Sequence, residues 1–214
     1  MANKNDFGIN TQCVHVGEVE DKQFKGAVSP IYMATSYAFD GVDVKRYPRY
    51  YNTPNQEMLC KKIAALEHTE AGLIFGSGMA AISTALFAFL KAGDHIIIQQ
   101  VIYGGTYHLI VSEFEKYGIE YSFTDSDQVA DFIPLIKENT KVLYIETPSN
   151  PLLGITDIKA IGVLAKERNI ITMIDNTFAS PINQTPADFG IDIILHSATK
   201  YMGGHSDISA GAIA

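Results

Sequence analysis

Segments with a helical period alternate with short apolar runs from about Gln56 to the end of the chain. This alternation is typical of an α/β fold, in which helices cover a mostly parallel sheet. The predicted strands are Leu73–Phe75, His95–Gln99, Glu120–Thr124, Val142–Glu146, Ile170–Ile174 and Asp192–His196, with a last small-residue strand in Ser209–Ala214. The predicted helices are Gln56–His68, Met79–Lys91, Thr106–Tyr117, Val129–Glu138 and Ile158–Arg168.

The first 55 residues lack a sustained period and carry Pro30, Pro48 and several aromatic residues. They predict an extended N-terminal arm (residues 1–55) with one short helix at most, which lies on its own domain or on a neighbouring subunit. Residues 56–214 then form the sheet domain. Because the chain stops inside a predicted strand, we expect it to be a truncated form of a longer protein.

Composition narrows the class of protein. The chain has 214 residues, 47% of them hydrophobic, and a formal net charge of −8, which argues against a nucleic-acid partner. Two cysteines without metal spacing predict neither a disulfide framework nor a metal site, and they fit a reducing cytoplasm. The apolar stretch of residues 80–90 is too short to cross a bilayer, and the start lacks the layout of a signal peptide.

Polar residues follow most of the predicted strands, at the sheet edge where α/β proteins bind ligands. Each group alone has an ordinary explanation as a turn, a helix cap or a solvated residue. Together they provide a carboxylate, a lysine, a pair of hydroxyls and a Gly-rich helix start, the set that pyridoxal 5′-phosphate (PLP) chemistry needs. These groups are Gly76–Met79, Tyr103–Thr106, Glu146–Pro151, Asp175–Asn176 and Ser197–Lys200.

The stretches YPRYYNTPN, GSGMAA, YGGTY, ETPSNP, DNTF and SATKYMGGHSD occur in this order along almost the whole chain. They resemble the Cys/Met-metabolism (trans-sulfuration) family of fold-type I PLP-dependent enzymes. The resemblance implies the large domain of that fold and PLP as cofactor. It also implies a homo-oligomer, a dimer or a tetramer, that acts on a small amino-acid substrate.

Carried over position by position, the resemblance implies that Lys200 holds PLP as a Schiff base and that Asp175 pairs with the pyridine nitrogen. Tyr103 would stack on the ring, and Asn150 would lie near the ring 3-oxygen, with Glu146 beside it in a less certain role. The phosphate would be bound by Gly78, Met79, Ser197 and Thr199, and by Tyr47 and Arg49 from a neighbouring subunit.

Three departures from the family pattern matter. Asn52-Thr53-Pro54 has one extra residue before the proline, and Gly105 stands where methionine γ-lyases typically carry a cysteine. The third is length, because the family's C-terminal domain, with the arginine that holds the substrate carboxylate, is absent from this chain. His196 and His205 flank Lys200 without metal spacing, so we expect packing roles for them.

The preferred function is carbon–sulfur elimination at the β or γ position, as in cystathionine lyases. The motifs equally allow γ-replacement, as in cystathionine γ-synthase or O-acetylhomoserine sulfhydrylase, and the short length allows a non-catalytic remnant that binds PLP. A dinucleotide-binding domain fits poorly, because GSGM is not G-x-G-x-x-G and Gln99-Gln100 stand where an acidic residue is expected.

Overall fold

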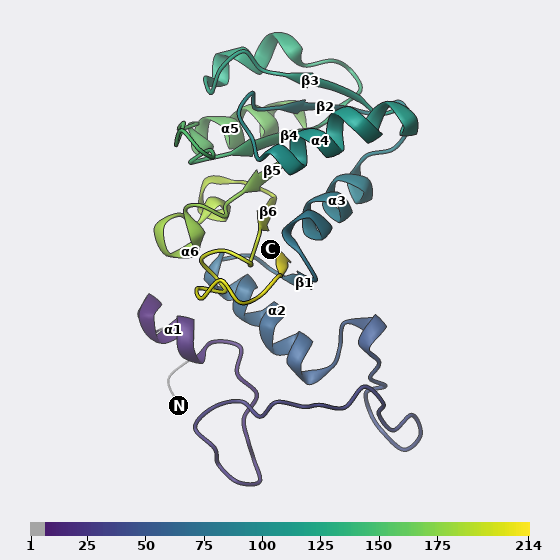
Figure 1. Ribbon diagram of the computed structural model, residues 1–214, viewed down its shortest axis with the longest axis vertical. Helices are drawn as coiled ribbons and strands as arrows, with labels where there is room; N and C mark the ends of the chain where they lie inside the picture. Colours follow the sequence, from purple (N-terminus) through teal and green to yellow (C-terminus); the bar gives the residue numbers. More distant parts are fainter. Residues whose placement is uncertain (1–6) are drawn as a thin grey trace. The chain divides into compact units, whose positions relative to one another are not determined.

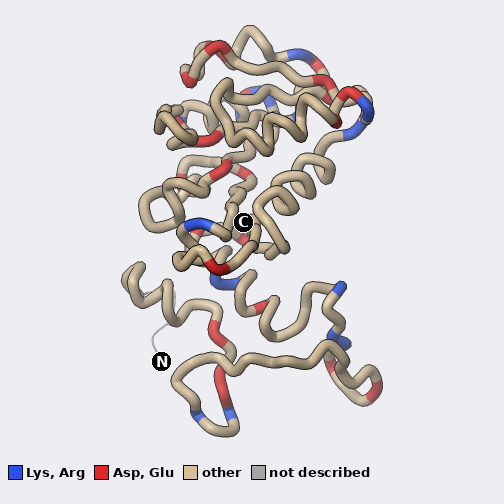
Figure 2. The backbone as a smooth tube through the Cα atoms, in the orientation of Figure 1, with Lys and Arg blue, Asp and Glu red and all other residues tan. Residues whose placement is uncertain are grey.

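The computed structural model describes residues 7–214 and divides the chain into two compact units. Of the described residues, the first unit contains 7–74 and 214, and the second contains 75–213. Figure 1 shows the elements of both units, and Figure 2 shows that charged residues are scattered along the backbone of each.

The first unit is mostly irregular and carries two α-helices, α1 (Ile9–His15) and α2 (Pro54–Leu66), and a 3₁₀ turn, η2 (Pro48–Tyr50). Strand β1 (Leu73–Phe75) begins at its end. The two helices are joined by Lys62, whose amine donates hydrogen bonds to the carbonyl oxygens of Cys13 (2.9 Å) and Val14 (2.7 Å). A cation at a helix C-terminus donates hydrogen bonds to unpaired carbonyls and interacts favourably with the helix dipole. The prediction of one short helix within this stretch agrees with α1.

The loop around the predicted phosphate ligands of the first unit is held by Asn52. Its Oδ1 accepts a hydrogen bond from the backbone N–H of Tyr47 (2.9 Å), and its Nδ2 donates to the carbonyl of Lys45 (2.8 Å). Helix α2 starts directly after it, where Gln56 Oε1 accepts from the hydroxyl of Thr53 (2.8 Å). The additional residue before Pro54 is thus part of an ordered loop and helix start.

The second unit is built on a sheet in the order β7-β6-β5-β4-β2-β3. All pairs among β2 to β6 are parallel, and β7 runs antiparallel to β6. The α/β class with a mostly parallel sheet is therefore confirmed. The strands are β2 (His95–Ile98), β3 (Glu120–Phe123), β4 (Thr140–Glu146), β5 (Ile171–Asp175), β6 (Ile193–His196) and β7 (Gly211–Ile213).

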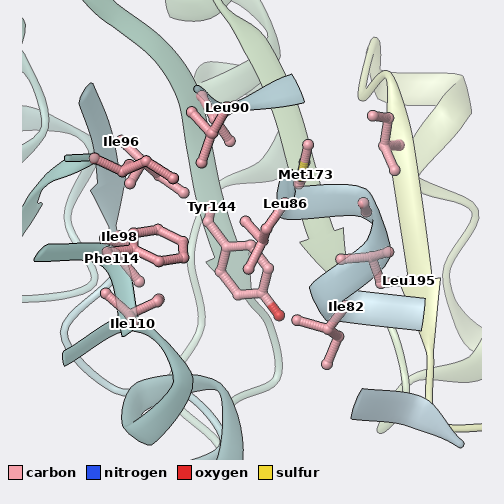
Figure 3. Close-up of a cluster of buried hydrophobic side chains, with 14 of the residues drawn as sticks. Ile82, Leu86, Leu90, Ile96, Ile98, Ile110, Phe114, Tyr144, Met173 and Leu195 are labelled. Atoms are coloured by element: carbon pink, nitrogen blue, oxygen red, sulfur yellow. The ribbon is translucent and has the colours of Figure 1, made fainter. Parts of the chain in front are cut away.

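Both faces of this sheet are buried, as expected for parallel strands. On one face Tyr144 of β4 lies among side chains of α3 (Gly78–Phe89) and α4 (Gly104–Glu113), including Leu86 and Ile110 (Figure 3). The alternate residues of β4, Leu143 and Ile145, are fully buried as well, and α5 (Ile158–Arg168) packs against β5. Short elements complete the unit: η3 (Phe114–Tyr117), α6 (Ser180–Asn183) and η6 (Pro186–Phe189).

The prediction of a helix over Val129–Glu138 is wrong. Two 3₁₀ turns stand there instead, η4 (Val129–Asp131) and η5 (Ile133–Leu135). Pro134 has no N–H to donate to an α-helical bond. Asp131 in addition accepts a hydrogen bond from Ser126, a contact that holds the segment in its turn conformation. Local apolar periodicity was outweighed by these two features.

The small residues near the end of the second unit have a steric reason. Strand β7 pairs Ala212 with His196 of β6, and a Cβ at Gly211 would lie 2.1 Å from the carbonyl oxygen of Ser77. No side chain fits at that distance. The predicted small-residue strand is confirmed, and its glycine lets β7 approach the loop that starts α3.

Candidate functional site

A cavity of about 310 Å³ opens at the carboxyl ends of β4, β5 and β6, beside the N-termini of α3 and α4. The register of the sheet explains the gathering, because Glu146 pairs with Asp175 and Asp175 pairs with Leu195. The nine candidate residues that lie in the second unit, Glu146 among them, all line this cavity. The lining residues are Ser77, Gly78, Met79, Ile82, Tyr103, Glu146, Asn150, Asp175, Thr177, Phe178, Ser197, Thr199 and Lys200.

One end of the cavity has the features of an anion site. Ser77 caps α3 by accepting a hydrogen bond from the N–H of Ala80 (3.1 Å), and the first-turn N–H groups of Gly78 and Met79 have no acceptor within the helix. A Cβ at Gly78 would lie 2.7 Å from the Cβ of Ser197, so only glycine lets the helix start and this serine come together. The helix dipole favours negative charge here.

Asp175 provides a buried carboxyl group at the end of β5. Its Oδ1 accepts a hydrogen bond from the N–H of Thr177 (3.0 Å), and the hydroxyl of Thr177 accepts from the N–H of Ser197 (2.8 Å). Burial raises the pKa of Asp175, against the opposing effect of the Thr177 hydrogen bonds. The Thr177 hydrogen bonds and the nearby His196 offset this burial only in part, so a cationic group bound in the cavity would stabilise the carboxylate.

Lys200 follows β6 on a tight turn that fixes its backbone. Its N–H donates to the carbonyl of Ser197 (3.0 Å), and its own carbonyl accepts from Gly204 (2.9 Å). The side chain is exposed and lines the cavity. Thr199 beside it exchanges hydrogen bonds of 3.0 Å with the carbonyl and N–H of Ala210, so its hydroxyl would have to turn its proton to donate to a phosphate.

Glu146, at the end of β4, forms hydrogen bonds with two other candidate residues, Tyr103 and Asn150. Its Oε2 accepts from the N–H of Tyr103 (2.6 Å), and its Oε1 accepts from the N–H of Asn150 (3.0 Å). Burial and the charge of Asp175 raise the pKa of Glu146 to about 7, although the two hydrogen bonds oppose the shift. Tyr103 is 45% exposed, so its ring is available to a ligand.

Four residues that line the cavity were absent from the predicted site: Ser77, Ile82, Thr177 and Phe178. Ser77 and Thr177 belong to two of the motifs that carry the family resemblance, GSGM and DNTF. Thr177 carries the bond between the loops after β5 and β6, a contact that neighbours in sequence do not reveal. Tyr47 and Arg49 lie in the first unit, both exposed, and their predicted role stays a prediction.

The described residues provide neither a cluster of metal ligands nor a membrane-spanning helix. Within residues 7–214 no cluster of three or more His, Cys, Asp and Glu side chains could hold a metal ion. No helix in that range is both long enough and apolar enough to span a membrane.

The raised pKa of Glu146 predicts that stability depends on pH. The folded pKa of about 7 lies above the usual 4.5, so the folded state binds the proton more tightly between these values. The free energy of unfolding should therefore fall as pH rises from 5 to 8, by up to about 3 kcal/mol. Glu146→Gln, which carries no charge at either pH, should lose this contribution.

Urea denaturation of cofactor-free wild type and Glu146→Gln at pH 5 and pH 8 checks this expectation. Comparing the two proteins cancels other titrating groups, such as His95, whose pKa is lowered mainly by burial and then by Lys137. The same change with pH in both proteins would contradict the assignment of the raised pKa to Glu146.

Comparisons with known proteins place the chain in a family. Residues 10–214 match the family described as Cys/Met metabolism PLP-dependent enzyme. This chain is a member of that family, and the resemblance seen in the motifs is confirmed. The fold class and the cofactor, PLP, are confirmed with it.

Similar proteins have several names within this family. Cystathionine β-lyase MetC of Bacillus subtilis is 45% identical over 215 residues, which cover 99% of this chain and 54% of that protein. A probable cystathionine γ-synthase of Herpetosiphon aurantiacus is 42% identical over 210 residues, 97% of this chain and 66% of that protein. The chain thus spans about half to two thirds of the length of these relatives.

Two solved structures share the fold. The structure of MetB from Corynebacterium glutamicum superposes with a TM-score of 0.93 at 40% identity, covering 99% of this chain and 56% of that one. Cystathionine γ-lyase from Lactobacillus plantarum, complexed with L-serine, superposes with a TM-score of 0.91 at 42% identity, covering 97% and 54%.

The residues around the cavity fit PLP. The close approach of Gly78 to Ser197 leaves backbone N–H groups for a phosphate, and the partly compensated carboxyl of Asp175 suits a protonated ring nitrogen. Lys200 supplies an amine at the same cavity. The three chemical groups of the cofactor therefore each have a counterpart in one site.

Proposed function

We propose that the protein to which this chain belongs is a PLP-dependent enzyme that eliminates the carbon–sulfur bond of cystathionine or a related thioether amino acid. The observation that carries the proposal is the single cavity that combines Lys200, Asp175 and the N-terminus of α3. When bound, PLP supplies a conjugated ring that takes up the electrons left as an amino acid loses its Cα proton.

Each cavity residue has a task in this proposal. Lys200 attaches the cofactor through Nζ and, once released from it, takes the Cα proton of the substrate. Asp175 holds a proton on the ring nitrogen through its carboxylate. Ser197 and the first N–H groups of α3 hold the phosphate, and Tyr103 covers a face of the ring.

Elimination rather than replacement is supported by the names of similar proteins. Besides the Bacillus protein, a cystathionine β-lyase of Lactococcus lactis is 44% identical over 208 residues and an L-methionine γ-lyase of Fusobacterium nucleatum is 39% identical over 219 residues, whereas the Herpetosiphon protein is named a probable cystathionine γ-synthase. Gly105 argues against the methionine γ-lyase pattern. A Cβ at this position would lie 2.5 Å from Cε1 of Tyr103, so a cysteine here would displace the ring.

Supplying substrates to the full-length protein tests the proposal. With cystathionine alone, we expect a 2-oxo acid and ammonia to form without any added nucleophile. O-acylhomoserine with cysteine or sulfide is the second assay, and thioether formation is followed separately. Thioether or homocysteine formation with negligible oxo acid from cystathionine would favour γ-replacement, and no turnover in either assay would favour a non-catalytic PLP-binding protein.

We also propose a homo-oligomer in which Tyr47 and Arg49 complete the phosphate site of a neighbouring subunit. Both side chains are exposed, and several large apolar residues of the same stretch are exposed too, among them Phe24, Ile31 and Met33. Exposed apolar groups of this size are typical of an interaction surface. A reducing cytoplasmic location is proposed as well, supported by the free thiols of Cys13 and Cys60.

Mixing two inactive variants tests the shared site. Arg49→Ala and Lys200→Ala proteins, combined under conditions that exchange subunits, should form some hybrid sites with both groups intact and recover part of the activity. Exchange without recovered activity would mean that Arg49 serves its own subunit or has no role in the site.

A further inference from the structure

A chain of hydrogen bonds centred on Gln99 and Glu146 joins three loops at the edge of the cavity. Gln99 follows β2 and is fully buried. Its Oε1 accepts from the N–H of Glu146 (3.2 Å), and its Nε2 donates to the carbonyl of Glu146 (2.9 Å). The amide therefore holds the backbone of Glu146 from both sides.

Further bonds fix the Gln99 side chain itself. Its Oε1 also accepts from the hydroxyl of Thr156 (3.0 Å), and its Nε2 also donates to Asp127 (3.0 Å). Five contacts on one buried amide, counting one to the carbonyl of Val101 (3.2 Å), leave it little freedom. The loops after β2, β3 and β4 thus share one anchor.

The carboxylate of Glu146 extends this anchor to the cavity. Its two oxygens accept from Tyr103 (2.6 Å) and Asn150 (3.0 Å), one from each of two loops whose residues line the cavity. Two N–H donors at separate points require two acceptors on one side chain, which a carboxylate offers and an amide does not. A carboxyl that is only 5% exposed is costly, so a group needed only for packing would be apolar.

We propose that Glu146 is a positioning residue, whose carboxylate fixes Tyr103 and Asn150 where they meet the cofactor while Gln99 holds Glu146 in place. This inference rests on the proposed function for its cofactor. The hydrogen bonds from Glu146 to the loops of Tyr103 and Asn150 do not rest on that function, and they can be measured without PLP.

The first measurement uses cofactor-free protein at pH 8, where Glu146 with its pKa of about 7 is mostly ionised. In Glu146→Gln one N–H faces the amide –NH₂ instead of an oxygen. Hydrogen exchange at the amide of Tyr103 or Asn150 should therefore become about 10-fold faster or more, while that of Tyr144 inside β4 stays unchanged. Unchanged exchange at both amides would overturn the proposal.

The second measurement is the affinity and visible absorption band of PLP. We expect about 10-fold weaker binding and a shifted band in Glu146→Gln. Glu120→Gln is the matched control, because this carboxylate of the same unit is half exposed and bonds Lys137 (2.9 Å) away from the cavity. Wild-type affinity and band in Glu146→Gln would also overturn the proposal.

Glu146→Asp keeps the charge but is one methylene shorter, so it should reach only one of the two N–H groups. Glu146→Asp tests the proposal if Glu146→Gln fails to fold. Wild-type exchange and affinity in Glu146→Asp would contradict the proposal that both N–H groups need the Glu146 carboxylate. If wild type itself binds no PLP, the proposed function fails, and hydrogen exchange still decides whether Glu146 holds the two loops.

Discussion

Lys200→Ala in the full-length protein is expected to abolish turnover, with a loss of at least about four orders of magnitude. The reason is that one amine performs two tasks, attachment of the cofactor and removal of the substrate Cα proton. The variant should also lose the visible absorption band of the bound cofactor. Steady-state kinetics and an absorption spectrum measure both effects.

Lys166→Ala is the matched control for this substitution. Lys166 is also exposed, but it lies in the last turn of α5, outside the residues that line the cavity. We expect wild-type turnover and spectrum in this variant. Retention of the absorption band in Lys200→Ala would place the attachment on another lysine.

Asp175→Asn is expected to keep the cofactor bound and to lower turnover by at least about 100-fold. An amide cannot hold a proton on the ring nitrogen as a carboxylate does, so the ring becomes a weaker acceptor of electrons. The loss should appear in kcat, whereas the PLP content measured after denaturation stays near one per chain.

Asp125→Asn is the control for Asp175→Asn, because Asp125 is exposed in the loop after β3 and outside the cavity. Wild-type kcat in Asp175→Asn would remove Asp175 from its role. Loss of both kcat and PLP content would show a role in binding rather than in the electronic effect.

The sheet and the central site residues could be predicted from the sequence. Parallel strands end at the same edge, so the polar residues after apolar runs were expected to converge, and Asp175 and Lys200 line one cavity. The last strand, made of small residues, could also be predicted. Their physical reason, the close approach of Gly211 to Ser77, needed the structure.

Other features depended on contacts between distant positions. Gln99 was read only as a residue that does not fit a dinucleotide site, yet it bonds both backbone groups of Glu146 across neighbouring strands. The role of Thr177 as a link to Ser197 was likewise invisible, because no local pattern specifies which side chain a strand-end N–H will find. The helix expected over residues 129–138 does not form, because Pro134 lacks the N–H that an α-helix needs at this position despite the apolar period around it.

Chemical mapping of the attached cofactor tests whether Lys200 is the residue that holds PLP. The protein is saturated with PLP, reduced with borohydride, digested and examined by mass spectrometry across all of its lysines. We predict a pyridoxyl group on the peptide that contains Lys200 and on no other. A stoichiometric group on a different lysine, or bound PLP that leaves every lysine unmodified, would contradict the assignment of Lys200.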